Sequence, residues 1–215
     1  MDIAQFVVGY LVFLFSTTCH EAAHAYLAYK GGDPTAYLGG HVTLDPIPHI
    51  KRSPFGMVVV PLLGGLFGGL MIGWASVPVD PYWARRHPTR AAFMSLAGPM
   101  TNLLLAVIAF IVLKYLNSQG TFSAVEPGSA LAAARSALYT LVFLNVALAL
   151  LNLIPFPPLD GAGVAEGFSP RAAGSFYDKL RENQMLQLLG LVLIWQIFPR
   201  LFDPVQMFVF SLLRS

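Results

Sequence analysis

Three side chains near the N-terminus have the types and spacing that a metal-dependent hydrolase needs. His20, Glu21 and His24 form the pattern His-Glu-x-x-His. Residues four apart on an α-helix lie one turn above each other, so the two imidazoles can share one Zn²⁺ while the carboxylate acts on a water molecule at the ion. The competing interpretation is a fortuitous pair of histidines, or a pH-sensitive polar patch on a helix.

The pattern lies inside an apolar stretch that runs from about residue 6 to residue 29. Charged groups at membrane depth are costly and are rarely found there without a function. This position therefore favours a zinc hydrolase that acts within the bilayer over a fortuitous pair. The stretch has no basic segment before it, so we expect it to belong to the mature protein rather than to a signal peptide.

The composition is that of an integral membrane protein. Of the 215 residues, 56% are hydrophobic and 11% are charged, whereas soluble domains have about 25% charged residues. A bilayer span needs about 20 mostly apolar residues, and such stretches occur near 6–29, 55–79, 92–113, 136–156 and 185–213. We expect one all-α polytopic domain over 1–215, with about four to six transmembrane helices in contact with lipid. The net charge of +2 forms no basic stripe, which argues against a nucleic-acid partner.

The stretch 55–79 is a poor uninterrupted helix, because it contains Pro61 and two Gly-Gly pairs. Basic residues prefer the cytoplasmic side of a membrane. They flank this stretch at both ends: Lys51 and Arg52 before it, and Arg85, Arg86 and Arg90 after it. We therefore expect a re-entrant segment in the cell membrane, with the active site towards the cytoplasmic side.

Two further local patterns concern secondary structure. Residues 36–44 predict a short β-hairpin near the active site, whose edge could pair with an unfolded substrate by strand addition. In the C-terminal stretch of about 185–213, Pro199 and Pro204 predict one full helix followed by a short interfacial piece.

Catalytic zinc usually has three protein ligands, and Asp160 is the best candidate for the third. Three prolines break the chain just before Asp160, and Gly161 allows a sharp turn just after it. A plain turn at the membrane surface is the alternative. For Asp160 to reach the histidines, the helices at 6–29 and 136–156 must end on the same side of the membrane. Only one of the two stretches between them can then cross, and we expect the smoother one, 92–113.

Two amides, Asn102 and Asn152, are further candidates for the site. Each could satisfy backbone groups near a helix end, or donate a hydrogen bond to the substrate carbonyl and the developing oxyanion. Cys19 adjoins His20, but neighbouring residues on a helix point in different directions, so we interpret it as a packing residue. His41 and His49 are interpreted in the same way, as packing or surface residues.

The chain resembles the site-2 protease family of intramembrane zinc metalloproteases. Three motifs carry the resemblance: His-Glu-x-x-His at 20–24, Ala-Gly-Pro-x-x-Asn at 97–102, and the stretch from Asn152 to Asp160-Gly161. The resemblance implies one Zn²⁺ per chain, held by His20, His24 and Asp160, with Glu21 as general base. It also implies cleavage of a transmembrane protein substrate, and it covers a catalytic core of about 5–165 with no inserted PDZ or CBS domain.

Two residues depart from the family pattern and bear on substrate preference. His41 stands where relatives commonly have a longer basic side chain, and Ser76 stands where a lysine is expected.

Two other functions use the same residues. A membrane metal carrier would need a line of acids or histidines through several helices, and the interiors of 92–113 and 136–156 contain none. A protein that only binds membrane clients would not need Glu21. The sequence therefore favours the protease.

Overall fold

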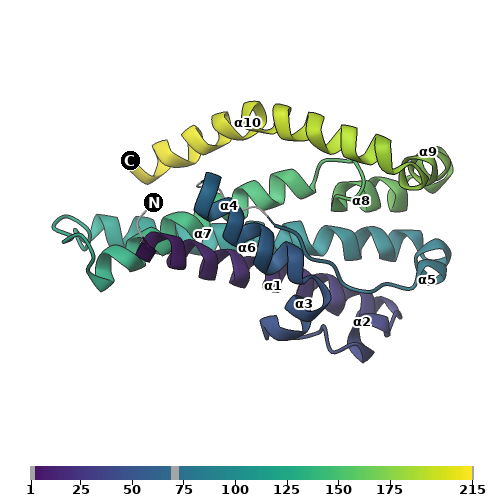
Figure 1. Cartoon of the computed structure of the whole chain (residues 1–215), viewed down its shortest axis with the longest axis horizontal. Coiled ribbons are helices and arrows are strands. Elements are labelled where there is room, and N and C mark those ends of the chain that lie inside the picture. Colours follow the sequence, from purple (N-terminus) through teal and green to yellow (C-terminus); the bar gives the residue numbers. More distant parts are fainter. Residues whose placement is uncertain (1–2, 69–72, 215) are drawn as a thin grey trace.

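Four long helices form the body of the protein in the computed structural model, which describes residues 3–68 and 73–214. They are α1 (Ile3–Gly31), α6 (Pro88–Ser118), α7 (Ala130–Asn152) and α10 (Gln184–Arg214). All four are long and apolar enough to cross a membrane. They run in alternating directions along the long axis of the molecule (Figure 1). The expectation of an all-α polytopic membrane protein is confirmed.

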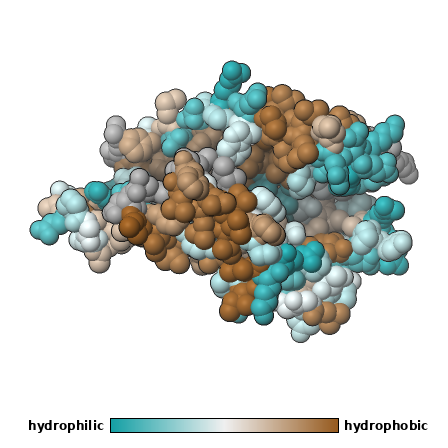
Figure 2. Space-filling view, viewed as in Figure 1, coloured by the Kyte–Doolittle hydropathy of each residue, from teal (hydrophilic) through white to brown (hydrophobic). Residues whose placement is uncertain are grey.

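Much of the surface is apolar. In Figure 2, apolar side chains cover a large part of the middle of the molecule, whereas polar side chains gather at its right-hand end and its left-hand tip, with smaller polar patches at the top centre and the lower middle. The right-hand end carries α5 (Pro81–Arg86) and α9 (Pro170–Glu182), and the left-hand tip carries the connection between α6 and α7. The long helices therefore run between two polar ends.

Helix α6 lies at the centre of the bundle and packs against α1, α7 and α8 (Asp160–Phe168). Small residues are buried where α6 meets its neighbours. A Cβ at Gly98 of α6 would run into His20 and His24 of α1. A Cβ at Gly167 of α8 would run into Ala92 of α6. Lipid chains are as apolar as leucine, so membrane helices associate through close approach at small residues rather than through hydrophobic burial. This close packing brings α6 against the motif on α1.

The prediction of a β-hairpin at 36–44 is wrong, because the described residues contain no strand. The chain instead forms α2 (Thr35–Leu38), a series of bends, and α3 (Pro46–Arg52). Side-chain hydrogen bonds at the starts of these helices explain the outcome. The Asp33 carboxylate, two residues before α2, accepts a hydrogen bond from the Thr35 N–H at 2.9 Å. Asp45 is the N-cap residue of α3, and its carboxylate accepts one from the Ile47 N–H at 2.9 Å. These local bonds hold helical turns where residue preferences alone favour extended chain.

The stretch predicted to re-enter the membrane begins with a single π-helical element, η1 (Phe55–Val59), and continues as α4 (Val60–Gly68). The segment Phe55–Phe67 is bent by 112° relative to α3, which fits either a broken span or a re-entrant loop. The chain is extended from residue 73 to residue 80 and then enters α5, on a path that runs back past α4 (Figure 1). Residues 69–72 lie outside the described part of the chain.

The end of this return path is tied to the end of α1. The Asp80 N–H donates to the buried Asp33 carboxylate at 2.8 Å, just after α1 ends. The Trp83 indole N–H donates to the Gly31 carbonyl at 3.0 Å, and the Arg90 guanidinium donates to the same carbonyl at 3.1 Å. The return of the chain to the end of α1 is what a re-entrant segment requires.

Thiol labelling tests this topology. Cysteines introduced at Lys51 and Arg85, one at a time in a Cys19→Ala background, should react with a membrane-impermeant reagent from the same face. A cysteine at Glu126, in the connection at the opposite polar end, should react from the other face only. Labelling in intact cells and in inverted vesicles measures both. Reaction of the first two positions from opposite faces would show that 55–79 crosses the membrane.

The C-terminal stretch also differs from the expectation. Pro199 and Pro204 both lie inside one continuous helix, α10, which arches along the top of the molecule in Figure 1. A proline removes one helical N–H and often bends a helix, but membrane helices tolerate it more readily than soluble ones. The two prolines thus leave α10 unbroken.

Candidate metal centre

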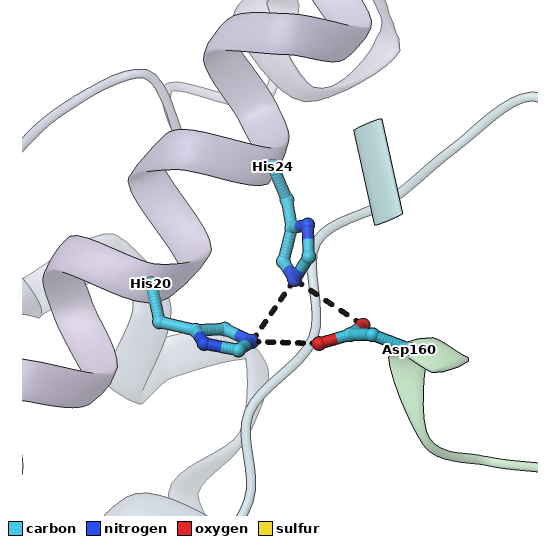
Figure 3. Close-up of side chains that lie close together, drawn as sticks. All are labelled: His20, His24 and Asp160. Carbon is cyan, nitrogen blue, oxygen red and sulfur yellow. Dashed lines mark hydrogen bonds and ion pairs between the residues drawn. The ribbon is translucent and has the colours of Figure 1, made fainter. Parts of the chain in front are cut away.

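Helices α1 and α8 bring together three side chains that could hold a metal ion. His20 and His24 project from α1, and Asp160 projects from the first residue of α8, as Figure 3 shows. The two imidazole Nε2 atoms are 2.9 Å apart, and the Asp160 carboxylate oxygens lie 3.1 Å from Nε2 of His20 and 3.3 Å from Nε2 of His24. Among the described residues this is the one group of three or more such side chains that could hold a metal ion.

The direction of the helices makes this meeting possible. Helices α1 and α7 end on the same side, with α6 as the crossing between them (Figure 1). After α7 the chain folds tightly over residues 153–159 before α8 begins at Asp160. A Cβ at Gly161 would lie 2.3 Å from the Leu153 carbonyl oxygen, so this turn has room for glycine only. Asp160, which was expected on irregular backbone after three prolines, is instead the first residue of helix α8.

Gly98 on α6 lies directly behind the facing imidazole nitrogens. A Cβ at this position would be 2.4 Å from Nε2 of His24 and 2.5 Å from Nε2 of His20. The Ala-Gly-Pro stretch thus supplies a backbone surface against which the two histidines rest. Any side chain here would enter the space that a metal ion needs.

A cavity of about 400 Å³ opens onto the three ligand side chains. Glu21 lines this cavity and is only 4% exposed. Its Oε2 has no hydrogen-bond partner among the described residues. The wall also includes the extended segment at 73–79. Much of the rest is formed by residues of α6 and α7: Met94, Ser95, Leu148, Leu151 and Asn152.

Comparison with known proteins agrees with this geometry. The family model described as "Peptidase family M50" matches residues 8–133 and 119–196. The chain belongs to peptidase family M50. This is the site-2 protease family, and the protein is accordingly a zinc metalloprotease of that type.

Bacterial relatives are named "Putative zinc metalloprotease". YwhC of Bacillus subtilis strain 168 is 37% identical over 168 residues, which cover 76% of this chain and 71% of the relative. Rip2 of Mycolicibacterium smegmatis is 30% identical over 164 residues, covering 76% and 58%, and Rip2 of Mycobacterium tuberculosis strain H37Rv is 32% identical over 160 residues, covering 74% and 55%. The chain thus spans little more than half the length of the Rip2 proteins. No solved structure matches it.

The hydrogen bonds of the two histidines fit the zinc ion that the M50 family implies. Nδ1–H of His24 donates to the Met94 carbonyl at 2.7 Å, and Nδ1–H of His20 donates to Asn102 Oδ1 at 2.5 Å. With both protons on Nδ1, both Nε2 lone pairs face each other and the Asp160 carboxylate. A metal cation placed among these three atoms would be bound by all three electron-pair donors. Tetrahedral zinc would space its ligand atoms about 3.3 Å apart, close to the separations seen here.

The position of Asp160 fits the same ion. Its two carboxylate oxygens face the Nε2 atoms of His20 and His24, and the carboxylate is the form of this side chain that binds metal.

The two predicted substrate contacts lie in different places in this M50 peptidase. Asn152 lines the cavity, where its side-chain amide donates to the Leu148 carbonyl at 3.0 Å. Asn102 does not line the cavity: it is fully buried behind His20, and both polar atoms of its amide bind other side chains. The substrate contact predicted for Asn102 is therefore not the contact that the structure gives it.

One residue near the site carries no signal that sequence reasoning could use: Asn145, which binds Asn102 from α7. The segment 73–79 gave a signal only through its resemblance to the family, in which Ser76 is a departure, and not through a strand-like pattern. Cys19 is buried and stands outside the ligand group, in line with a packing role. His41 and His49 are buried with ring centroids 5.5 Å apart, which also fits packing.

Proposed function

We propose that this zinc protease hydrolyses peptide bonds in transmembrane segments of membrane-protein substrates. His20, His24 and Asp160 would hold one Zn²⁺ per chain, with Glu21 as general base. The observation that carries the proposal is the meeting of these four side chains at one cavity on α1, a helix long and apolar enough to cross the membrane. A bond cleaved at this depth belongs to a substrate segment that has itself entered the bilayer.

The chemistry divides between the ion and the protein. When bound, zinc supplies the Lewis acidity that makes water a nucleophile near neutral pH and polarises a carbonyl group. Glu21 takes the proton from the attacking water and returns it to the leaving amine. Its Oε2 is buried at the cavity wall with no partner among the described residues, and is available for this proton. Asn152 lines the same cavity, and we propose that its amide contacts the substrate carbonyl.

The extended segment 73–79 supports a mode of substrate binding. Its N-terminal end is held by the Trp74 N–H, which donates to the Gly56 carbonyl at 3.1 Å, and its C-terminal end by the bond from Asp80 to Asp33. Between these ends, the backbone groups of residues 75–79 have no hydrogen-bond partner among the described residues. Backbone groups away from water need partners, and an extended substrate can supply them by strand addition.

The sequence predicts strand addition at a hairpin over 36–44. Because that hairpin does not form, we propose the segment at 73–79 for the same role. Pairing with backbone groups selects for an unwound peptide rather than for particular side chains. A substrate helix must unwind locally before cleavage, because its own hydrogen bonds shelter the peptide bonds. Ser76, one of the departures from the family pattern, lies in this segment and lines the cavity, so it is placed to influence substrate preference.

Proline substitution tests the binding mode. Val77→Pro removes one backbone N–H from the cavity-lining segment, whereas Val77→Ala shortens the side chain and keeps the N–H. We expect Val77→Pro to cleave at least about 10-fold more slowly than Val77→Ala, since each lost backbone bond is worth about 1 kcal/mol and its buried partner stays unpaired. The probe is a co-expressed single-span membrane protein with a Gly-Gly break in its span.

The zinc content of both variants should match that of the unsubstituted protein, because residue 77 is not a ligand. Equal cleavage rates for Val77→Pro and Val77→Ala would remove strand addition at this position from the proposal.

We further propose that the protein is a multi-pass protein of the cell membrane, with the catalytic end towards the cytoplasm. Most basic residues lie at the ends of α1, α3, α5 and α9, as the preference of basic side chains for the cytoplasmic side requires. Its partners on this proposal are a transmembrane protein substrate and membrane lipid, and no nucleic acid.

A further inference from the structure

A chain of buried polar side chains runs from the metal centre into the helix bundle. Asn102 Nδ2 donates to Asn145 Oδ1 at 2.7 Å, and Asn145 Nδ2 donates to the Ser16 hydroxyl at 2.8 Å. At the other end, Asn102 Oδ1 accepts from His20. Ser16, Asn102 and Asn145 are each fully buried, at 0% exposure. This series of hydrogen bonds links α1, α6 and α7. It begins at His20 and ends at Ser16, and both residues lie on α1.

The hydrogen bond from Asn145 to Leu141 determines which atom donates in each hydrogen bond between Asn145 and His20. Asn145 Nδ2 also donates to the Leu141 carbonyl at 2.9 Å, and a carbonyl oxygen can only accept. The Asn145 amide nitrogen must therefore face Leu141, which turns its oxygen towards Asn102. That oxygen binds the amide nitrogen of Asn102, so the oxygen of Asn102 must face His20. A backbone carbonyl on α7 thus sets the orientation of both amides.

The consequence reaches the metal-binding atom. Because an amide oxygen faces Nδ1 of His20, the proton of that ring must be on Nδ1, and the lone pair must be on Nε2. Nε2 is the atom that faces His24 and Asp160. If Asn102 turned its amide by half a rotation, its nitrogen would face Nδ1 and favour the tautomer with the proton on Nε2. That tautomer cannot bind a metal through Nε2.

We propose that Asn145 is a positioning residue for zinc binding, which acts through Asn102 to hold His20 in its metal-binding tautomer. The proposal rests on the ligand set given under the proposed function. Within the described residues, Asn145 does not line the cavity, and its hydrogen bonds go to Asn102, Ser16 and Leu141. It therefore acts on His20 only through the side-chain amide of Asn102. Outer partners of this kind commonly change metal affinity by 10- to 100-fold.

The test measures zinc affinity rather than cleavage. Asn145→Leu keeps much of the side-chain volume but removes the acceptor for Asn102, whereas Asn145→Asp keeps an oxygen at that place. In competition with a chelating dye, the purified full-length protein with Asn145→Leu should bind zinc about 10- to 100-fold more weakly. Asn145→Asp should stay within about threefold of the unsubstituted protein. Should the leucine variant not accumulate in the membrane, Asn145→Val and Asn145→Thr make the same comparison at smaller volume.

Two controls separate this proposal from its rivals. Val142→Ala removes packing from α7 one turn away, at a residue 1% exposed, and should leave zinc affinity unchanged. His20→Ala should lose zinc binding. Equal affinity in Asn145→Leu and the unsubstituted protein, with zinc lost in His20→Ala, overturns the role of Asn145 alone. Equal loss in Asn145→Asp and Asn145→Leu, or loss in Val142→Ala, overturns it as well. Full zinc binding in His20→Ala overturns the ligand set itself.

Discussion

Glu21→Gln should abolish proteolysis while leaving zinc in place. Glutamine fills the same volume in the wall of the cavity but cannot accept the proton of the attacking water. Loss of a general base costs about 10²- to 10⁴-fold in rate. The measurement is cleavage of the co-expressed single-span substrate with the Gly-Gly break, alongside the metal content of the purified protein.

The matched control for this prediction is His20→Ala, in which both zinc and cleavage should be lost. Together the two variants distinguish a base from a ligand. Cleavage by Glu21→Gln at an undiminished rate would contradict the catalytic role of Glu21. Loss of zinc from Glu21→Gln would instead show that the carboxylate supports the metal centre.

Gly98→Ala should have the second large effect, although it adds only one methyl group. The new Cβ would lie 2.4 Å from Nε2 of His24 and 2.5 Å from Nε2 of His20, while ordinary contact begins at 3.4 Å. The imidazoles or α6 must therefore shift by about an ångström. A displacement of that size at reacting groups can cost about 100-fold in rate. We expect at least this loss of cleavage, together with reduced zinc affinity.

Helix stability separates this effect from misfolding. Alanine in place of glycine inside a helix stabilises it by about 0.5–1 kcal/mol, so α6 itself should not suffer from the substitution. Met100→Ala, two residues along the same helix at a side chain 50% exposed, is the control and should retain cleavage. Gly98→Ala protein with full activity would show that the imidazoles can move aside, and that the close approach of α6 is not required.

The sequence identified the three side chains that the structure brings together, but it did not predict the secondary structure around them correctly. His20 and His24 come together because an α-helix has 3.6 residues per turn, a local rule that holds wherever the helix forms. Asp160 could be anticipated from its prolines and from the requirement that two helices end on one side. The hairpin predicted at 36–44 was wrong, because the Asp33 carboxylate binds the Thr35 N–H where α2 begins and the Asp45 carboxylate caps α3. The continuity of α10 through two prolines also could not be anticipated from residue preferences.

By itself, the sequence determined the hydrophobic helices, the catalytic pattern on the first of them, and hence the class of chemistry. These follow from spacing and composition, which act over a few residues. Only the tertiary structure decided what lies behind and across from the metal centre. Asn102 meets His20 over 82 positions of sequence, and Asn145 meets Ser16 over 129. Such meetings depend on how α1, α6 and α7 pack, and packing is a property of the whole bundle that no local pattern contains.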